Sequence, residues 1–214
     1  MGTETAEQLR LVLPADLPHR EEVLAKTSRH LDLIEEANQH FNLTRITTPR
    51  EAAIKHVLDS VLPWKFFEAA RHVLDAGSGA GFPGVPLALV LPHVRFTLAE
   101  SIHKRARFLE SVVDALELDN AEVAAERAED VLRRRHIDLI TARAVAPMDR
   151  AIEWFGPAIK KGARALLYKG PDADTEIGSA NAQARRAKVQ IRVVDRYVLP
   201  DALGTRTMVE LARA

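Results

Sequence analysis

Four glycines stand within eight residues of this chain, directly behind a short apolar run. The run is HVLDA at His72 to Ala76, and the glycines fall in the segment GSGAGFPG over residues 77–84. Glycine is needed where the backbone turns with positive φ or where another group approaches it closely. A strand that leads into such a loop and then into a helix, here expected over 85–91, is typical of α/β folds that bind a nucleotide cofactor at this turn. The segment therefore predicts an α/β fold with a cofactor site at the end of its first strand.

Short β-branched or apolar runs alternate with amphipathic stretches through the rest of the chain. Alternation of this kind implies right-handed crossovers and a mostly parallel sheet. The expected fold is therefore α/β and Rossmann-like, with a mostly parallel seven-stranded sheet. The predicted strands cover residues 72–76, 94–99, 121–124, 137–142, 163–169, 191–198 and 207–212.

Residues 5–70 have a helical pattern instead. The sequence Thr48-Pro49-Arg50-Glu51 forms a capping box with proline at the first helical position, and it predicts a helix that runs to about Val61. We expect residues 1–70 to be an N-terminal helical extension packed on a core of residues 71–214, within one structural domain. Before the capping box, four apolar residues recur at helical spacing and share one face, namely Leu24, Leu31, Ile34 and Phe41.

The chain contains no cysteine. Disulfides, cysteine-ligated metals and every mechanism with a thiolate nucleophile are thereby excluded. The eight histidines are scattered, and no pair at helical spacing stands beside carboxylates, so we expect no metal site.

The formal net charge is zero, with 30 basic and 30 acidic side chains. A nucleic-acid partner therefore has to be argued from local patches rather than from bulk charge. No run of eighteen apolar residues is present, and Glu4 and Glu7 stand where a signal peptide would carry positive charge. We expect a cytoplasmic protein without a membrane contact or a stable protein partner.

Two acids near the glycines help to identify the cofactor. Glu100 closes the second predicted strand, and an acid there can accept the ribose hydroxyls of NAD or of S-adenosylmethionine. Asp75 stands two residues before Gly77, where a carboxylate could organise the loop and hold a methionine amino group but would repel a pyrophosphate. Pro83 and Pro86 also interrupt the first helical turn, whose N–H groups would bind phosphate. S-adenosylmethionine is favoured; a dinucleotide and a tight turn without a ligand remain alternatives.

Six motifs in order resemble one known family. They are residues 42–63 (NLTRITTPREAAIKHVLDSVLP), 74–89 (LDAGSGAGFPGVPLAL), 99–112 (AESIHKRARFLESV), 126–130 (ERAED), 141–147 (TARAVAP) and 166–170 (LLYKG). Together they resemble the bacterial small-subunit ribosomal RNA methyltransferase G family, also called glucose-inhibited division protein B. The resemblance implies methyl transfer from S-adenosylmethionine to N7 of one guanine in the 530-type loop of 16S ribosomal RNA. The implied partner is 16S rRNA, within the 30S subunit or an assembly intermediate.

The resemblance also implies where the cofactor binds. By the matching motifs, its contacts fall on Gly77, Phe82, Ala128, Glu129 and Arg143, with Ala128 and Glu129 expected in a loop after the third strand. To these positions the residues themselves add Asp75 and Glu100, and the loop glycines Gly79 and Gly81. Alternatives stay open for three of them: Phe82 could be core packing, Glu129 a solvated helix acid and Glu100 a charge at a helix N-terminus.

Arg143 stands where methyltransferases that act on amino groups carry an Asn/Asp-Pro-Pro-aromatic motif, which this chain lacks. The missing cysteine excludes the covalent route to pyrimidine carbon 5. N7 of guanine carries a lone pair and no proton, so alignment and electrostatics suffice without a general base. A cation at guanine O6 would fix the base and leave N7 free. Four residues are candidates for catalytic, RNA or guanine contacts, namely Arg143, Arg127, Arg206 and Lys169.

Several other polar residues have no assigned role at this stage. A surface ion pair is the alternative for any single arginine, and it is favoured for residues 133–135. His56, Asp59 and Ser60 share a helix face, and they could face a cleft or form a local His–Asp pair. Two basic segments, residues 104–107 and 185–188, could lie along RNA phosphates or simply be solvated.

Two other functions remain possible from the residues alone. One is a methyltransferase acting on a small molecule or a protein, with the N-terminal helices as a lid. The other is a non-catalytic RNA- or ribosome-binding protein of the same fold.

Overall fold

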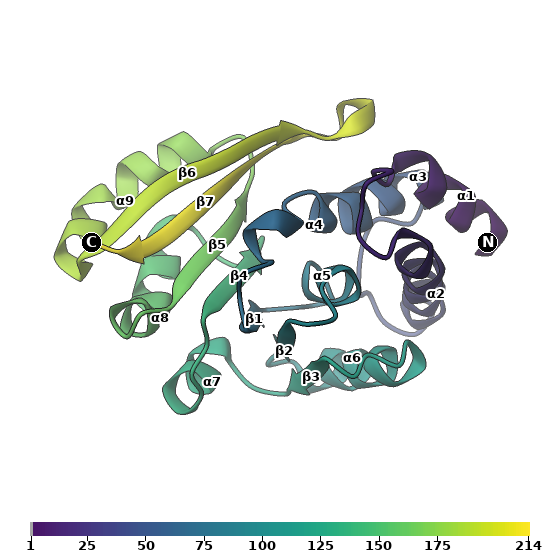
Figure 1. Ribbon diagram of the computed structural model, residues 1–214, viewed down its shortest axis with the longest axis horizontal. Coiled ribbons are helices and arrows are strands. Elements are labelled where there is room, and N and C mark those ends of the chain that lie inside the picture. Colours follow the sequence, from purple (N-terminus) through teal and green to yellow (C-terminus); the bar gives the residue numbers. More distant parts are fainter. Residues whose placement is uncertain (1) are drawn as a thin grey trace.

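The computed structural model describes residues 2–214 and contains one seven-stranded sheet (Figure 1). The strand order is β3-β2-β1-β4-β5-β7-β6. All pairs are parallel except those of β7, which runs antiparallel to both β5 and β6. The strands are β1 (His72–Ala76), β2 (Arg95–Ala99), β3 (Ala121–Ala124), β4 (Leu139–Arg143), β5 (Arg164–Lys169), β6 (Val189–Val198) and β7 (Thr205–Arg213). The predicted α/β class, the seven strands and the mostly parallel sheet are confirmed.

Helices cover both faces of the sheet (Figure 1). Side chains alternate between the faces along a strand, so Val73 belongs to one apolar cluster and Leu74 to the other. The Val73 face is covered by the N-terminal helices together with α5 (Gly84–Val90) and α6 (His103–Ala115). The Leu74 face is covered by α7 (Ala128–Arg134), α8 (Met148–Lys160) and α9 (Ala173–Ala187).

The N-terminal segment is largely helical, with two connecting loops before residue 49. Its elements are α1 (Gly2–Val12), α2 (Arg20–Asn38), α3 (Pro49–Ala52), the π-helix η1 (Ala53–Leu58), α4 (Asp59–Val61) and the 3₁₀ turn η2 (Trp64–Phe66). Residues 13–19 and 39–48 form loops, so the helical expectation is wrong there. The Asn38 side chain accepts hydrogen bonds from the N–H groups of Leu43 and Thr44, which holds the chain in a turn after α2. Leu9 and Ile54 lie in the same apolar cluster as Val73, so the segment packs directly on the sheet.

The predicted helix over residues 49–61 is present, with an unexpected interior. Thr48 caps it by accepting a hydrogen bond from the N–H of Glu51, and Pro49 occupies the first turn. Residues Ala53–Leu58 are wound as a π-helix. A π-turn adds a residue to one turn and rotates the remainder of the helix, and such turns are frequent at functional sites. The side chains after Leu58 therefore point in directions that α-helical spacing does not predict.

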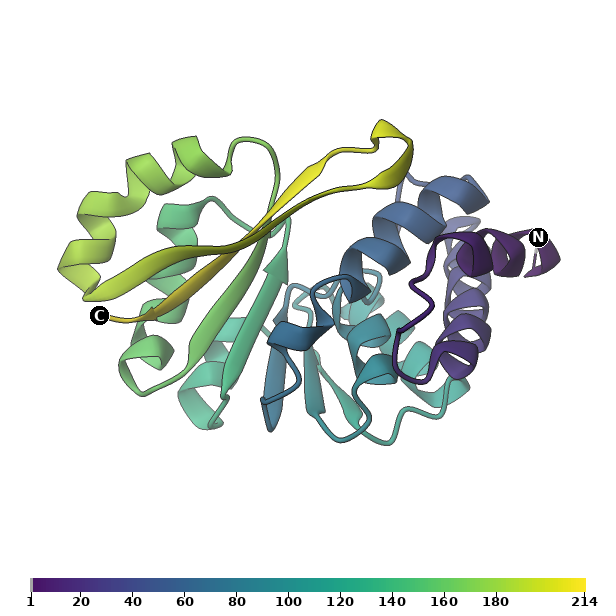
Figure 2. The same cartoon turned by 45° about the horizontal axis from the view of Figure 1, so that its top comes forward.

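Strands β6 and β7 form a long hairpin that reaches toward the N-terminal helices (Figure 2). Its tip contains the 3₁₀ turn η3 (Pro200–Ala202). The guanidinium of Arg50 forms two hydrogen bonds to the two carboxylate oxygens of Asp201, at 2.8 and 3.3 Å. A two-point ion pair of this kind has a defined geometry, so it ties the hairpin tip to α3. No helix in residues 2–214 is long and apolar enough to cross a membrane.

Candidate functional site

The glycine loop follows β1 at the carboxyl edge of the sheet. Gly77 has a φ of +71°, in the left-handed region that favours glycine. Gly84 is required for another reason: a Cβ there would lie 2.6 Å from Oδ2 of Asp75. That oxygen instead accepts a hydrogen bond from the Gly84 N–H at 3.0 Å. The first N–H group of α5 is thus occupied by Asp75, which fits the expectation that this turn does not hold a phosphate.

Asp75 is fully buried, and burial raises the pKa of its carboxyl from 3.8 to about 6. Its Oδ1 has no hydrogen-bond partner among the described residues. The first part of its predicted role, organising the loop, agrees with the bond to Gly84. Its contact with a cofactor amino group stays a prediction.

Glu100 connects the loop to the second strand. It follows β2 directly, it is 4% exposed, and it accepts hydrogen bonds from two backbone N–H groups, Gly79 at 3.1 Å and Ile102 at 2.8 Å. The bond to Ile102, the residue before α6, agrees with a charge at a helix N-terminus, and the bond to Gly79 shapes the glycine loop. Each carboxylate oxygen can accept more than one hydrogen bond, so ribose hydroxyls can still be accommodated.

A cavity of about 100 Å³ lies between the strand ends of β1 and β2 and the helices α7 and α8. We call it the glycine-loop cavity. Four residues predicted to contact the cofactor line it, namely Gly77, Glu100, Ala128 and Glu129, and so does Arg127, which was predicted to contact RNA or guanine instead. The other lining residues are Ala76, Ala99, Ser101, Glu126, Val145, Trp154 and Phe155. Ala128 and Glu129 begin α7, so their predicted placement in a loop is wrong, and Trp154 is a lining residue for which the sequence offered no signal.

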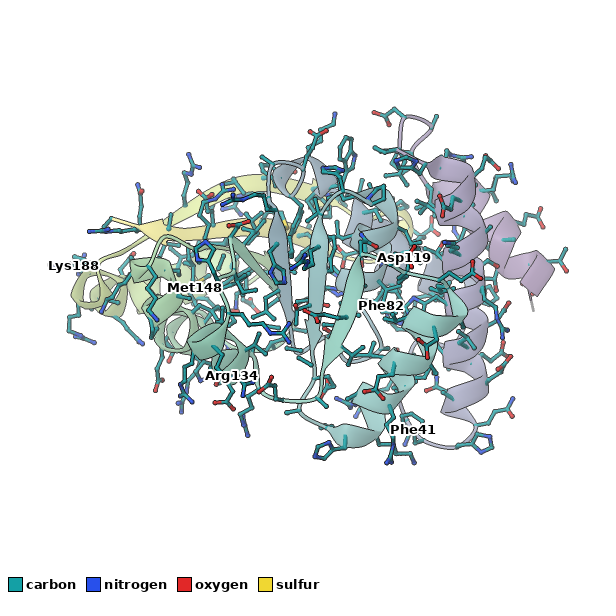
Figure 3. The ribbon with its side chains drawn as sticks, turned by 60° about the horizontal axis from the view of Figure 1, so that its bottom comes forward. Phe41, Phe82, Asp119, Arg134, Met148 and Lys188 are labelled. Carbon is teal, nitrogen blue, oxygen red and sulfur yellow. The ribbon has the colours of Figure 1, made fainter. Side chains whose placement is uncertain are left out.

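Phe82 is packed between two histidines from the N-terminal segment. Its ring stacks on His56 at 4.5 Å and on His30 at 4.8 Å, measured between ring centroids, and it is 5% exposed. Phe82 does not line the glycine-loop cavity, so the structure places its side chain in the core, as the packing alternative expected. Burial lowers the pKa of His30 to about 4 and that of His56 to about 3, so both rings are neutral near pH 7. In Figure 3, Phe82 lies far from Lys188, so the basic segment 185–188 at the end of α9 is remote from the Phe82 ring.

A second cavity, of about 470 Å³, lies at the carboxyl ends of β4 and β5. We call it the arginine cavity, because Arg143 and Arg206 line it together with Lys169. Arg143 ends β4, Lys169 ends β5, and Arg206 lies near the start of the antiparallel β7, so the topology brings all three to one edge. Arg127 does not line this cavity. The remaining lining residues are Ala144, Val145, Ala146, Pro147, Tyr168, Gly170 and Glu176.

Val145 connects the two cavities. It lines both of them, and its side chain lies so close to Gly77 that a Cβ on the glycine would be 2.9 Å from Cγ2 of Val145. The loop that carries Val145 is held by Lys169, whose Nζ donates to the carbonyl of Ala146 and to Glu176, both at 2.7 Å. Lys169 is 7% exposed and its charge is paired, so the structure gives it a role in holding this loop; its contact with RNA stays a prediction.

Asp59 joins Arg143 and Arg206. Its buried carboxylate lies 3.2 Å from NH1 of Arg143 and 3.0 Å from Nε of Arg206. His56 instead bonds to Thr44 at 3.0 Å, so the alternative of a local His56–Asp59 pair is wrong. The π-helix that precedes Asp59 is the physical reason, since it turns this carboxylate away from the His56 face.

The three arginines at 133–135 form surface ion pairs with acids, as expected: Arg133 with Asp130, Arg134 with Glu126 and Arg135 with Glu122. No metal-binding group of three or more histidine, aspartate or glutamate residues occurs within the part of the chain that the structure describes.

Solved structures with a similar fold define the class of protein. An O-methyltransferase from Bacillus cereus, in complex with SAH, matches with a TM-score of 0.59 at 17% identity, covering 86% of this chain and 91% of its own. The O-methyltransferase TomG from Streptomyces achromogenes, in complex with SAM, gives 0.59 at 18% identity, covering 99% and 96%. The fold is that of the S-adenosylmethionine-dependent methyltransferases, as predicted.

Sequence relatives identify the family within that class. The family model described as rRNA small subunit methyltransferase G matches residues 23–200. A ribosomal RNA small subunit methyltransferase G from Solibacter usitatus is 61% identical over 206 residues, which is 96% of this chain and 98% of the relative. One from Symbiobacterium thermophilum is 41% identical, covering 84% and 78%. The chain belongs to the rRNA small subunit methyltransferase G family, so the resemblance seen in the sequence and the assignment as a methyltransferase are confirmed.

Proposed function

We propose that this protein transfers a methyl group from S-adenosylmethionine to N7 of one guanine in the 530-type loop of 16S rRNA. The observation that carries the proposal is the pair of cavities that meet at Val145. One presents the Glu100 carboxylate together with the apolar side chains of Trp154 and Phe155, and the other presents Arg143 and Arg206. A methyl donor in the first and a base in the second would have their reacting atoms close to Val145.

The glycine-loop cavity fits the adenosine end of S-adenosylmethionine. Glu100 lines it and can accept the ribose hydroxyls, while Trp154, Phe155 and Val145 supply apolar surface for the adenine. Gly77 leaves the backbone bare at the point where the cavity approaches Val145. Oδ1 of Asp75 is buried and has no hydrogen-bond partner among the described residues, so it could accept a hydrogen bond from the amino group of the cofactor. When bound, the cofactor supplies an electrophilic methyl group on a sulfonium.

The arginine cavity fits a base that needs no deprotonation. Among the described residues that line it, the only carboxylate is that of Glu176, which is paired with Lys169, and no histidine lines it. Methylation at N7 of guanine needs no general base, so this lining is compatible with the proposal. A guanidinium of Arg143 or Arg206 at guanine O6 would orient the base in its plane and leave the N7 lone pair free for in-line attack.

The substrate is expected to be 16S rRNA inside the 30S subunit or an assembly intermediate, in the cytoplasm. With no net charge on the chain, binding of naked RNA would be weak, and the shape of the assembled subunit would supply much of the affinity. The beginning of α6 offers Lys104, Arg105 and Arg107 at the same edge of the sheet as both cavities, and none of them forms a salt bridge within residues 2–214.

The test uses 30S subunits from a strain that lacks this methyltransferase. The protein is incubated with these subunits and methyl-labelled S-adenosylmethionine, and the modified nucleotide is mapped. We expect label at N7 of one guanine in the 530-type loop. Absence of label in 16S rRNA from a protein that binds the cofactor in calorimetry would contradict the proposal. Glu100→Ala serves as the control for donor binding, and it should weaken cofactor binding without changing the site of methylation.

A further inference from the structure

A buried carboxylate behind the arginine cavity has no role in the function proposed so far. Asp59 is 0% exposed, and it comes from α4 in the N-terminal segment. Its Oδ2 is shared by Arg143 and Arg206, and its Oδ1 accepts a hydrogen bond from the hydroxyl of Tyr197 at 3.0 Å. The charge is thus satisfied by three side chains, from β4, β6 and β7.

Arg143 and Arg206 each use only some of their guanidinium N–H groups in hydrogen bonds within the protein. Arg143 uses NH1 for both Asp59 and the carbonyl of Lys55, the latter at 2.7 Å. Arg206 uses Nε for Asp59 and NH1 for the carbonyl of Thr205. A guanidinium has five N–H donors, so each retains donors that can be offered to a ligand.

The charges around the cavity leave an excess of one positive unit. Arg143, Arg206 and Lys169 are the cations, and Asp59 and Glu176 are the anions paired with them. The arginines are 15% and 20% exposed in their side chains, so water screens them little. This arrangement suits an electron-rich ligand atom, such as a carbonyl oxygen of a base.

We propose that Asp59 is a positioning residue for the methyl acceptor, an assignment that rests on the proposed function of the arginine cavity. Its carboxylate holds Arg143 and Arg206 in one geometry, with their free N–H groups directed at the acceptor base. The N-terminal helical run over 49–61 thereby becomes part of the acceptor site, since it carries the group that orders two arginines of the sheet.

The molecule contains a matched arrangement for comparison. Glu210 in β7 is also buried, and it also pairs with two arginines, Arg164 at 3.0 Å and Arg192 at 2.6 Å. None of these three residues lines either cavity. Glu210→Gln therefore removes a buried charge that holds two arginines, as Asp59→Asn does, without touching the acceptor site.

The experiment compares Asp59→Asn and Glu210→Gln in methyl transfer to 30S subunits at saturating cofactor. We expect Asp59→Asn to lower kcat about 100-fold, because displacing catalytic groups by about 1 Å has effects of this size. Glu210→Gln should leave kcat within about twofold of the wild-type value, even if it lowers the melting temperature as much as Asp59→Asn does. A double-mutant cycle with Arg206→Ala measures the coupling between Asp59 and Arg206. In the Arg206→Ala variant, adding Asp59→Asn should lower kcat much less than it does in the wild-type protein.

A second measurement does not depend on activity. The Nε–H proton of Arg206, bonded to Asp59, should give a slowly exchanging NMR signal that is lost in Asp59→Asn and kept in Glu210→Gln. Should Asp59→Asn fail to fold, Tyr197→Phe removes only one hydrogen bond to the carboxylate, and a fall in kcat of about fivefold is expected.

Three results would overturn the inference: unchanged kcat in Asp59→Asn, an equal loss in Glu210→Gln, or persistence of the Arg206 signal without Asp59. A wild-type protein that does not methylate 16S rRNA would instead overturn the proposed function, and the Arg206 signal would still decide whether Asp59 positions it.

Discussion

The two buried carboxylates that each hold a pair of arginines differ in where their partners come from. Asp59 lies 84 and 147 residues from its arginines along the chain, whereas Glu210 lies 46 and 18 residues from its own. The arginine side chains at Asp59 are 15% and 20% exposed, and those at Glu210 are 46% and 63% exposed. Around Asp59, one carboxylate and two arginines thus form an enclosed cluster that joins distant parts of the chain. Around Glu210, the same three charges form a partly solvated cluster that links neighbouring strands.

This difference shows that a buried ion pair has to be interpreted by its location. Removing charges from water costs several kcal/mol per ion, and hydrogen bonds must compensate. At Glu210 the guanidinium groups keep much of their hydration, so forming these ion pairs has a low desolvation cost. At Asp59 the compensation comes from Tyr197 and from backbone carbonyls, and the enclosed arrangement borders a cavity. An arrangement this costly next to a cavity is better explained by a requirement for geometry than by stability.

The largest expected effect separates the two regions by activity. Arg143→Ala should lower methyl transfer by about 100- to 1000-fold, because it removes a guanidinium from the arginine cavity. Arg164→Ala removes the corresponding partner of Glu210 and should leave transfer within about twofold. Steady-state methylation of 30S subunits measures both, and urea unfolding provides the stability control. Equal activity of the two variants would break the contrast between the two regions.

The next prediction distinguishes the Asp59 region from the Glu210 region by how their stability depends on pH. Burial lowers the pKa of His30 to about 4, below its ordinary 6.5, so the unfolded chain binds this proton first. Stability should therefore fall as the pH drops below about 6.5, and His30 alone should contribute about 2 kcal/mol of loss by pH 5. Urea unfolding at pH 7.5 and pH 5 should show this loss reduced in His30→Gln, which keeps an N–H donor for Ala80 and does not titrate.

Hydrogen exchange should place this loss in the molecule. His30 and His56 lie in α2 and η1, in the N-terminal segment that also carries Asp59, and the Glu210 region has no buried histidine among residues 2–214. Amides of α2 and η1 should therefore lose protection at pH 5 before those of β5 and β7. Uniform loss of protection, or the same pH dependence in His30→Gln, would contradict the assignment to His30.

A smaller effect tests the contact between Gly77 and Val145. Alanine at Gly77 or at Gly79 should be strained by about 1–2 kcal/mol, since both positions have positive φ. Only at Gly77 does the added Cβ collide with Val145, at 2.9 Å; at Gly79 its nearest neighbour is 3.9 Å away. Calorimetry should therefore show S-adenosylmethionine binding weakened about tenfold more by Gly77→Ala than by Gly79→Ala. Equal affinities of the two variants for S-adenosylmethionine would show that the Val145 side chain moves away from the added Cβ without a measurable cost.

The smallest effect is expected at an exposed glycine of α9 that lines neither cavity. Gly178 lies inside α9, and a Cβ there would meet no atom within 4 Å. Gly178→Ala should stabilise the protein by about 0.5–1 kcal/mol through helix propensity, and methyl transfer should not change. A melting curve and the 30S assay measure both, and a change in transfer would indicate that α9 is coupled to the site.

Most of the sheet could be predicted from the sequence, and the site only in part. The predicted strands agree with the observed ones to within about two residues, because alternation and apolar runs are local signals. The glycine loop and Glu100 are predictable for a similar reason, since turn conformation depends on the residues in the turn. Ala128 and Glu129 start a helix rather than lying in a loop, because the boundary of a short helix has a weaker local signal than its interior.

The sequence did not predict the partners of the polar residues. Asp59 and His56 stand out in the sequence, but the π-helix between them has no clear sequence signal, and it separates their directions. The sequence did not predict that the ring of Phe82 stacks on His30 and His56, and its contact with a cofactor stays a prediction. Val145 lies in the motif over 141–147, but the motif did not indicate its position at two cavities, which depends on a loop held by Lys169.

The sequence by itself determined the fold class, the family and the side of the sheet that carries the site. These depend on periodicity, glycine conformation and short motifs, all of which act over a few residues. The tertiary structure alone decided that Asp59 meets Arg143 and Arg206, that Lys169 holds a loop instead of facing solvent, and that Val145 lines both cavities. Such pairings depend on the packing of segments far apart in the chain, where burial removes competing water and a small rotation changes which partner is reached.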